Sequence, residues 1–155
     1  MYGKILVPVD DIESAELALS SARDLAKSTG ASVILLHVVT PDHPLVASDE
    51  HVAGVHAAAV VVEQAQRDEA AHLADQQSKL QAEADKLSAD GVSATAEAVL
   101  GHAHEEIVRA VKDLGVGLVV LSTHGRRGVS RALLGSVADE VVHDVEVPVM
   151  IVRRS

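Results

Sequence analysis

Five short apolar segments, rich in Val, Ile and Leu, alternate with helical patterns along the chain. They lie at Lys4–Val9, Ser32–Val39, Ser93–Val99, Gly117–Leu121 and Val147–Val152. Four of them lack strict alternation of apolar and polar residues, which is typical of parallel strands covered by helices on both faces. Ser93–Val99 alternates more, and this pattern predicts an edge strand.

Between these segments, apolar residues recur at helical spacing. Three stripes are predicted, with members Ala15, Leu19, Ala22, Leu25 and Ala26, then Ile107, Ala110, Val111 and Leu114, then Val137, Val141 and Val142. Gly30 and Gly115 are placed to end the first two helices. Residues 57–89 favour a long amphipathic helix, preceded by an irregular connection at 40–56. The alternating order predicts one α/β domain over residues 1–155, a parallel sheet with helices on both faces.

The composition narrows the classes of function. The chain has a formal net charge of −10, no cysteine, and Tyr2 as its one aromatic residue. Such an acidic surface repels phosphate backbones, and one ring cannot build a platform for stacked bases, so we expect no nucleic-acid partner. No apolar run suits a membrane span and no secretory pattern is visible, so we expect no membrane partner. The lack of thiols fits a reducing compartment, and we expect a cytoplasmic protein.

The first apolar segment ends abruptly in two carboxylates, Asp10 and Asp11. In open parallel α/β sheets, ligands bind beyond the carboxyl ends of the strands, where the strand order reverses. Asp10 is therefore a candidate acceptor for a ribose hydroxyl or the amino group of adenine. The alternative is that Asp10 or Asp11 only caps or precedes the next helix.

A glycine-rich loop follows the fourth apolar segment and forms a second candidate site. Gly125 and Gly128 lie in this loop, and Gly135-Ser136 opens the next helix. Successive loop amides form anion-binding concavities, and the first amides of a helix favour a phosphate. The alternative for Ser136 is a capping box with Asp139, in which its hydroxyl serves only the helix.

Three arginines give this loop a local positive charge within an acidic chain. Arg126, Arg127 and Arg131 fall within six positions that contain no acidic residue. A guanidinium group can bind phosphate oxygens through two hydrogen bonds. A surface loop with solvated arginines is the alternative interpretation.

Together these stretches resemble a single-domain universal stress protein of the ATP-binding type, over essentially the whole chain. The family motif after the fourth strand is Gly-x2-Gly-x9-Gly-Ser/Thr. Gly125 and Gly135-Ser136 match it, and Ser122 stands at the first glycine. Three further segments resemble the first, second and last strands of the family: Ile5–Asp10, Leu36-His37-Val38 and Val147–Val152.

The resemblance implies a fold, a ligand and partners. The fold is a three-layer sandwich of the adenine-nucleotide α-hydrolase type, with five parallel strands in the order 3-2-1-4-5. The ligand is ATP, with a magnesium ion bridging its phosphates where one is bound. A homodimer through Val147–Val152 and a regulated protein partner of unknown identity are also implied. The nucleotide-binding residues that the resemblance implies are Pro8, Asp10, Val38, Leu121, Ser122, Gly125, Gly135, Ser136 and Val137. Because they adjoin these residues, we also expect nucleotide contacts from Val9, His124, Arg126, Arg127 and Gly128.

Three functions remain open at this point. The leading hypothesis is an ATP-binding regulatory protein of the stress response. The alternatives are a slow ATP hydrolase that depends on His124 or Asp10, and a nucleotide-free interaction protein of the same fold. The chain contains no Gly-x-Ser-x-Gly elbow, no Gly-x4-Gly-Lys-Ser/Thr loop and no Gly-x-Gly-x-x-Gly fingerprint. The scattered histidines, including His102 and His104, lack the spacing of a helical metal site, so we expect neither a metal centre nor an efficient enzyme.

Overall fold

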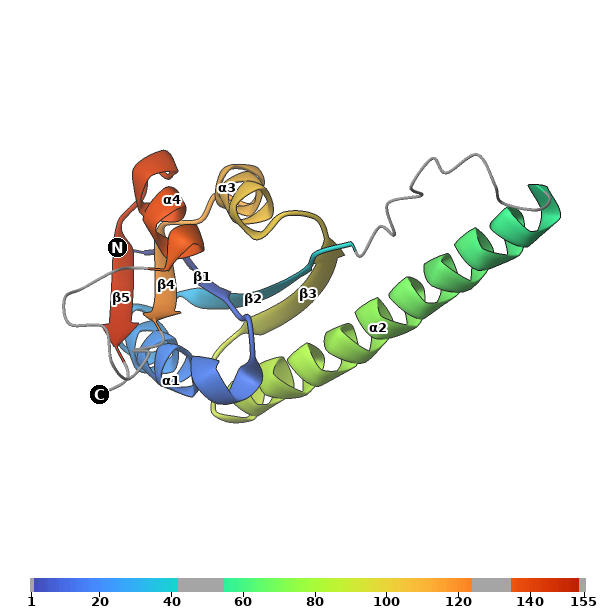
Figure 1. Ribbon diagram of the computed structural model, residues 1–155. Coiled ribbons are helices and arrows are strands. Elements are labelled where there is room, and N and C mark those ends of the chain that lie inside the picture. The colour runs from blue at the N-terminus through green and yellow to red at the C-terminus, as the bar shows by residue number, and fades with distance from the viewer. Residues whose placement is uncertain (1, 42–54, 124–134, 154–155) are drawn as a thin grey trace.

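The computed structural model describes residues 2–41, 55–123 and 135–153 and shows a parallel sheet between two layers of helices (Figure 1). The strands are β1 (Lys4–Pro8), β2 (Ser32–Val39), β3 (Ala94–Leu100), β4 (Leu118–Thr123) and β5 (Val149–Arg153). Their order in the sheet is β3-β2-β1-β4-β5, and every neighbouring pair is parallel. The predicted α/β fold, its strand order and the edge position of β3 are therefore confirmed.

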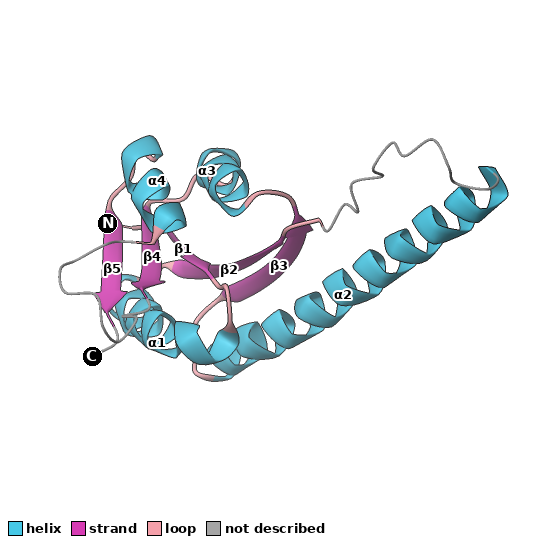
Figure 2. Ribbon diagram, viewed as in Figure 1, coloured by secondary structure: helices cyan, strands magenta, loops and turns pink. Residues whose placement is uncertain are grey.

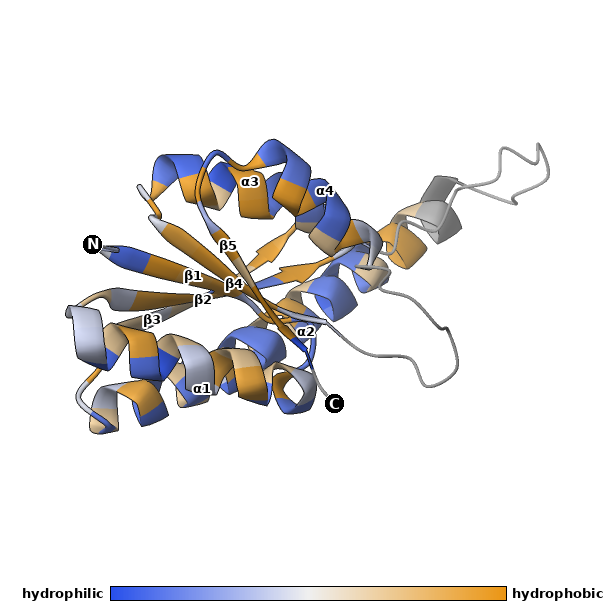
Figure 3. Cartoon of the chain, turned by 90° about the vertical axis from the view of Figure 1, so that its left-hand side faces the viewer, coloured by the Kyte–Doolittle hydropathy of each residue, from blue (hydrophilic) through white to orange (hydrophobic). Residues whose placement is uncertain are grey.

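In the described parts of the chain, four helices cover the two faces of the sheet (Figure 2). They are α1 (Ile12–Thr29), α2 (Val55–Ala89), α3 (Ala103–Asp113) and α4 (Ser136–Asp144). Helices α1 and α2 lie on one face, and α3 and α4 lie on the other (Figure 3). The chain leaves β1 for β2 on one side, whereas β4 pairs with β1 on the other side. The strand order therefore reverses between β1 and β4, which is where ligands bind in such sheets.

The side chains of β1 alternate between two separate core layers. Ile5 and Val7 point into the layer under α1 and α2, and Leu6 points into the layer under α3 and α4. All three are fully buried. Because both faces of the strand are covered, its sequence reads as a continuous apolar run and not as an alternating one.

Helix α1 begins and ends at the residues that the sequence indicates. Asp11 is its N-cap, and Gly30 follows its last turn with a φ of 74°. A residue with a Cβ is disfavoured in that left-handed conformation, so glycine suits this position. The Gly30 N–H donates to Ala26 C=O at 2.8 Å, which satisfies one carbonyl of the final turn.

Helix α2 has 35 residues, which corresponds to a length of about 52 Å. Over residues 59–89, where side-chain burial is described, the buried residues of α2 are Leu80, Ala84 and Leu87 near its C-terminus. The N-terminal part projects beyond the sheet (Figure 1), and there Val60 and Val61 are 64% and 61% exposed. The predicted helix at 57–89 is confirmed within two residues. Most of the predicted connection, 42–54, lies outside the described residues.

Strands β4 and β5 differ most from their predicted bounds, by up to two residues. Strand β4 continues two residues past Leu121, because Ser122 and Thr123 pair with Val152 and Arg153 of β5. Strand β5 begins at Val149 and not at 147. Within the described ranges, no helix combines the length and the apolar character needed to cross a membrane.

Candidate functional site

The end of β1 places Asp10 at the point where the strand order reverses. Strand β1 pairs with β2 as far as Pro8, which lies opposite Leu36. One further bond, from Val9 N–H to Leu36 C=O at 2.8 Å, extends the ladder. Val9 is buried, and Asp10 is exposed directly after it. The Asp10 carboxylate is therefore available to a ligand at the carboxyl edge.

The two adjacent carboxylates have different roles. Asp11 Oδ2 accepts a hydrogen bond from Ser14 N–H at 3.1 Å, and Ser14 Oγ donates to Asp11 C=O at 2.9 Å. The capping alternative is thus correct for Asp11, which satisfies one of the unpaired amides of the first turn of α1. Asp10 takes no part in this cap and keeps its place as a candidate ligand-binding group.

The main chain of Val38 faces the space beyond the end of β1. Residues of β2 with odd numbers bond to β3, as Val33 N–H to Ser93 C=O shows, whereas Leu36 bonds to β1. Val38 has the same orientation as Leu36, but β1 has already ended. Among the described residues, neither its N–H nor its C=O has a hydrogen-bond partner. One donor and one acceptor therefore lie side by side next to Asp10.

The imidazole of His37 binds the carbonyl group of Val9, which would otherwise accept the next hydrogen bond of the β1–β2 ladder. Its Nδ1 lies 2.6 Å from the carbonyl oxygen of Val9. A carbonyl can only accept, so Nδ1 carries the proton and donates it. In a continuing parallel ladder, Val9 C=O would instead accept from Val38 N–H. His37 thus lies at the exact residue pair where the β1–β2 ladder stops.

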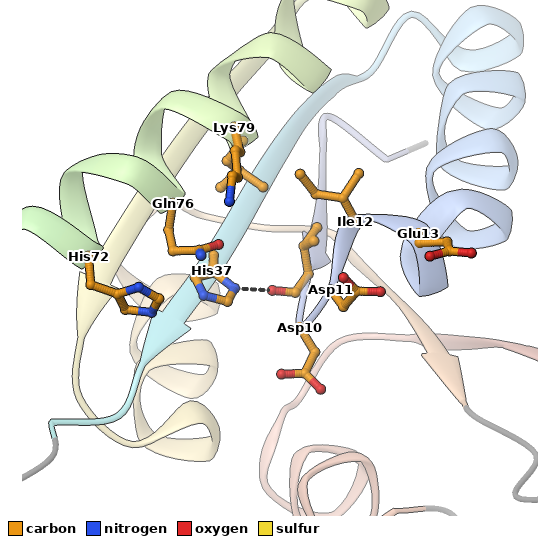
Figure 4. Close-up of a pocket in the computed structure, with 10 residues that line it drawn as sticks. Asp10, Asp11, Ile12, Glu13, His37, His72, Gln76 and Lys79 are labelled. Carbon is orange, nitrogen blue, oxygen red and sulfur yellow. Dashed lines mark hydrogen bonds between the residues drawn. The ribbon is translucent and has the colours of Figure 1, made fainter.

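A pocket of about 550 Å³ lies beside these groups, between the ends of β1 and β2 and helices α1 and α2. Its lining residues are Val9, Asp10, Asp11, Ile12, Glu13, His37, His72, Gln76, Lys79 and Leu80. Figure 4 shows His72, Gln76 and Lys79 extending from α2 on the side of His37, and Asp10 pointing away from them. Lys79 also forms an ion pair with Asp75 at 2.8 Å.

Of the predicted site residues that the structure describes, Val9 and Asp10 alone line this pocket. The polar residues of α2 were not predicted, because nothing in the polar helical pattern marks His72, Gln76 or Lys79 as facing the sheet. His37 was noticed only as part of a family-like stretch. Its position directly before Val38 on an otherwise apolar strand is the signal that could have found it.

The start of α4 forms the second part of the candidate site. Gly135 is the N-cap, with no side-chain capping bond, and Ser136 is the first helical residue. The predicted alternative of a Ser136–Asp139 capping box is therefore wrong, since Ser136 is one position too late to cap. The first helical bond runs from Asp139 N–H to Gly135 C=O at 2.9 Å. The amides before Asp139 make no bond within the helix, and such amides favour an anion.

The remaining predicted residues lie on both faces of the sheet. Val38 and Leu121 point into the core layer under α3 and α4, whereas Val9 points into the layer under α1 and α2. Ser122 is half-buried in β4, and Val137 is 36% exposed on α4. The loop residues His124, Gly125, Arg126, Arg127, Gly128 and Arg131 lie outside the described residues.

Two histidines outside this region, His104 and His143, pair with acidic residues of α4. His104 Nε2 lies 2.7 Å from Asp144 Oδ2, which links α3 to α4. In the part of the chain that the structure describes, no group of three or more His, Asp or Glu residues is arranged to hold a metal ion.

The fold and the site define an open parallel α/β domain with its candidate site at the switch point of the strand order. The sequence profile of the universal stress protein family matches residues 1–153. The universal stress protein MJ0577 of Methanocaldococcus jannaschii is 31% identical over 99% of this chain and 96% of its own length. The chain therefore belongs to the universal stress protein family.

Solved structures of relatives share this architecture. The structure of MJ0577 matches with a TM-score of 0.77 and 29% identity, and covers 100% of this chain and 98% of its own. A universal stress protein of Archaeoglobus fulgidus in complex with dAMP matches with a TM-score of 0.64 and 19% identity, over 97% of each chain. A universal stress protein in complex with cAMP has the same TM-score at 20% identity, and covers 99% of this chain and 98% of its own. The latter two likenesses concern the fold.

Proposed function

We propose that this chain is an ATP-binding regulatory protein that holds the nucleotide between the end of β1 and the start of α4. The observation that carries this proposal is the main chain of Val38, which lies next to Asp10 at the switch point and has no hydrogen-bond partner among the described residues. Relatives of the same fold that hold dAMP and cAMP support an adenine nucleotide as the ligand.

The exposed groups of Val38 match the edge of adenine. Adenine presents an acceptor at N1 beside a donor at its 6-amino group, and Val38 presents an N–H beside a C=O. Two hydrogen bonds can form in this arrangement without any side chain. This suits a chain that has no Phe or Trp to stack on the base. Apolar contact with the base would come from neighbours such as Val9.

Asp10 and α4 would hold the rest of the nucleotide. The Asp10 carboxylate is an acceptor for the ribose hydroxyls. The phosphates would lie against the first amides of α4 at Ser136 and Val137, where the helix dipole favours negative charge. The glycine loop and its arginines are proposed to complete the cradle. Since no described cluster of side chains suits a metal ion, a magnesium ion would be held mainly by phosphate oxygens and water.

We further propose that two copies pair through β5 and that the bound nucleotide changes how the protein meets a regulated partner. Strand β5 is an edge strand, and none of its residues is fully buried. Edge strands present unpaired main-chain groups that a second copy can bind. The proposed place of action is the cytoplasm.

Titration calorimetry with ATP tests the proposed site. We expect binding to the wild-type protein and an affinity at least about tenfold lower in Asp10→Ala and in Gly135→Asp, because the first loses an acceptor and the second places a carboxylate against the phosphates. Asp113→Ala, an exposed carboxylate at the end of α3, is the matched control and should bind like the wild type. An absence of heat at millimolar ATP, or equal binding by all variants, would refute the proposal.

A further inference from the structure

We propose that His37 is a positioning residue that keeps the N–H of Val38 open for the adenine base by binding Val9 C=O in its place. This inference rests on the proposed function and adds a residue that acts through the main chain of its neighbour. The juxtaposition that carries it is the His37 ring on Val9 C=O next to the unpaired Val38 amide.

The strand register shows what His37 interrupts. Pro8 lies opposite Leu36, so Val9 lies opposite His37. A parallel pair at that position needs two bonds, Val9 N–H to Leu36 C=O and Val38 N–H to Val9 C=O. The first bond is formed at 2.8 Å, and the second is not formed. The imidazole bond to Val9 C=O, at 2.6 Å, is found where the second bond would be.

The ring lies at the edge of the pocket, and its hydrogen bond among the described residues is to Val9 C=O. His37 is half-buried and lines the pocket between β2 and α2. Figure 4 shows Gln76 and His72 of α2 on one side of the ring, and the dashed hydrogen bond, which joins Nδ1 to Val9 C=O, on the other. The neighbouring side chains of β2 are apolar, so the ring is the polar group on this strand that can reach Val9 C=O.

The hydrogen bond of His37 lowers the free-energy cost of binding adenine at Val38. Without the imidazole, Val38 N–H would close onto Val9 C=O and extend the ladder by one bond. Adenine N1 would then have to displace a hydrogen bond within the protein, and the net gain of its own bond would be lost. With the imidazole in place, the amide is already free, and the base meets a preorganised donor.

Amide hydrogen exchange measured by NMR tests the first half of this inference. In the wild-type protein without nucleotide, the Val38 amide should exchange much faster than the neighbouring ladder amides, and ATP should protect it. His37→Phe should protect the same amide without nucleotide, because the ladder can then close. His37→Asn is the matched variant, since its amide nitrogen can still donate to Val9 C=O and should leave Val38 exchanging fast. A slowly exchanging Val38 amide in the free wild-type protein would overturn the inference without any variant.

Base selectivity tests the second half. ITP differs from ATP in carrying a hydrogen at N1 and an oxygen at position 6. Its N1–H donor would therefore face the Val38 N–H donor, and its oxygen acceptor would face the Val38 C=O acceptor. We expect the wild-type protein and His37→Asn to prefer ATP over ITP, and His37→Phe to reduce this preference about five- to tenfold. Inorganic tripolyphosphate should bind all three proteins equally. An unchanged ATP-to-ITP ratio in His37→Phe would refute the role of His37.

The two experiments separate this inference from the proposed function. If the wild-type protein binds neither nucleotide, the proposed function fails, and the exchange rate of Val38 still decides whether His37 frees the amide. If ATP binds and the ratio is the same in all three proteins, only the role of His37 fails. A loss of tripolyphosphate affinity in His37→Phe would indicate general damage to the site and would also count against a positioning role.

Discussion

The side-chain oxygen of Gln77 accepts a hydrogen bond from the main-chain N–H of Ala98 at 2.6 Å, and the side-chain nitrogen of Gln77 donates to Ala96 C=O at 3.0 Å. Odd-numbered residues of β3 face β2, as the bond from Val33 N–H to Ser93 C=O shows. Ala96 and Ala98 therefore present their main-chain groups to the outer edge of the sheet. The side-chain amide of Gln77 on helix α2 bonds to both of these main-chain groups. A residue of a further strand would pair with them in the same way.

Removal of the Gln77 amide should destabilise this edge. Gln77→Ala leaves Ala98 N–H and Ala96 C=O without their partners, and we expect a loss of about 1–2 kcal/mol in the free energy of unfolding. Gln81→Ala is the matched control, because Gln81 is exposed and its one partner among the described residues is Asp85, one turn away. Urea denaturation of the two variants measures the difference. Equal stability of both variants would show that the edge does not depend on Gln77.

The packing of α2 on the sheet should depend on its C-terminal part alone. Leu80 is 1% exposed, so Leu80→Ala leaves a cavity, and we expect a cost of about 2–5 kcal/mol. Val61→Ala lies on the projecting part of the same helix, where the side chain is 61% exposed, and should change stability by less than about 0.5 kcal/mol. Thermal or urea unfolding followed by circular dichroism compares the two. A large effect of Val61→Ala would mean that the projecting part is buried in solution.

Substitutions of the two adjacent aspartates should have different effects: Asp11 should contribute to stability, and Asp10 should contribute to nucleotide binding. Asp11→Ala removes the N-cap of α1 and should lower the free energy of unfolding by about 1 kcal/mol. Asp10→Ala should leave stability within about 0.5 kcal/mol of the wild type, because the side chain is exposed and makes no described hydrogen bond. Denaturation and ATP calorimetry on the same two samples test both properties. The proposed division of roles is wrong if Asp10→Ala is the less stable variant.

Pairing through β5 should be sensitive to the outward-facing amide of Ile151. The bond from Val119 N–H to Pro148 C=O indicates that even-numbered residues of β5 face β4, so Ile151 faces outward. Ile151→Pro removes an outward N–H without removing a ladder bond, and we expect it to convert a dimer into a monomer. Light scattering during gel filtration at micromolar concentration measures the mass. A monomeric wild-type protein would contradict the proposed pairing.

The fold could be predicted because its determinants are local. The apolar run of β2 was predicted with its observed bounds, Ser32–Val39. The alternation in β3 marked an edge strand because one of its faces is partly exposed. The end of β4 was missed by two residues because Ser122 and Thr123 are polar, and their place in the sheet depends on pairing with β5. That pairing is a tertiary contact, which no local pattern encodes.

The candidate site was only partly predicted for the same reason. Asp10 follows an apolar strand directly, so its place at the carboxyl edge could be inferred. The role of His37 depends on the register of β2 against β1, and that of Gln77 depends on the register of α2 against β3. Both relationships join elements that are distant in the sequence. The distinction between Asp10 and Asp11 likewise required the hydrogen bond from Ser14.

The two borders of the sheet are not equivalent, and this limits how many copies can join. On the β3 border the amide of Gln77 occupies the groups that another chain would need, whereas the β5 border lacks such a cover among the described residues. A subunit with one unpaired edge strand can use that strand in a single twofold contact. After this contact has formed, neither copy has a second unpaired edge strand. If two copies pair through β5 as proposed, growth by strand addition would stop at that pair, and this geometry would protect the protein against open-ended fibres.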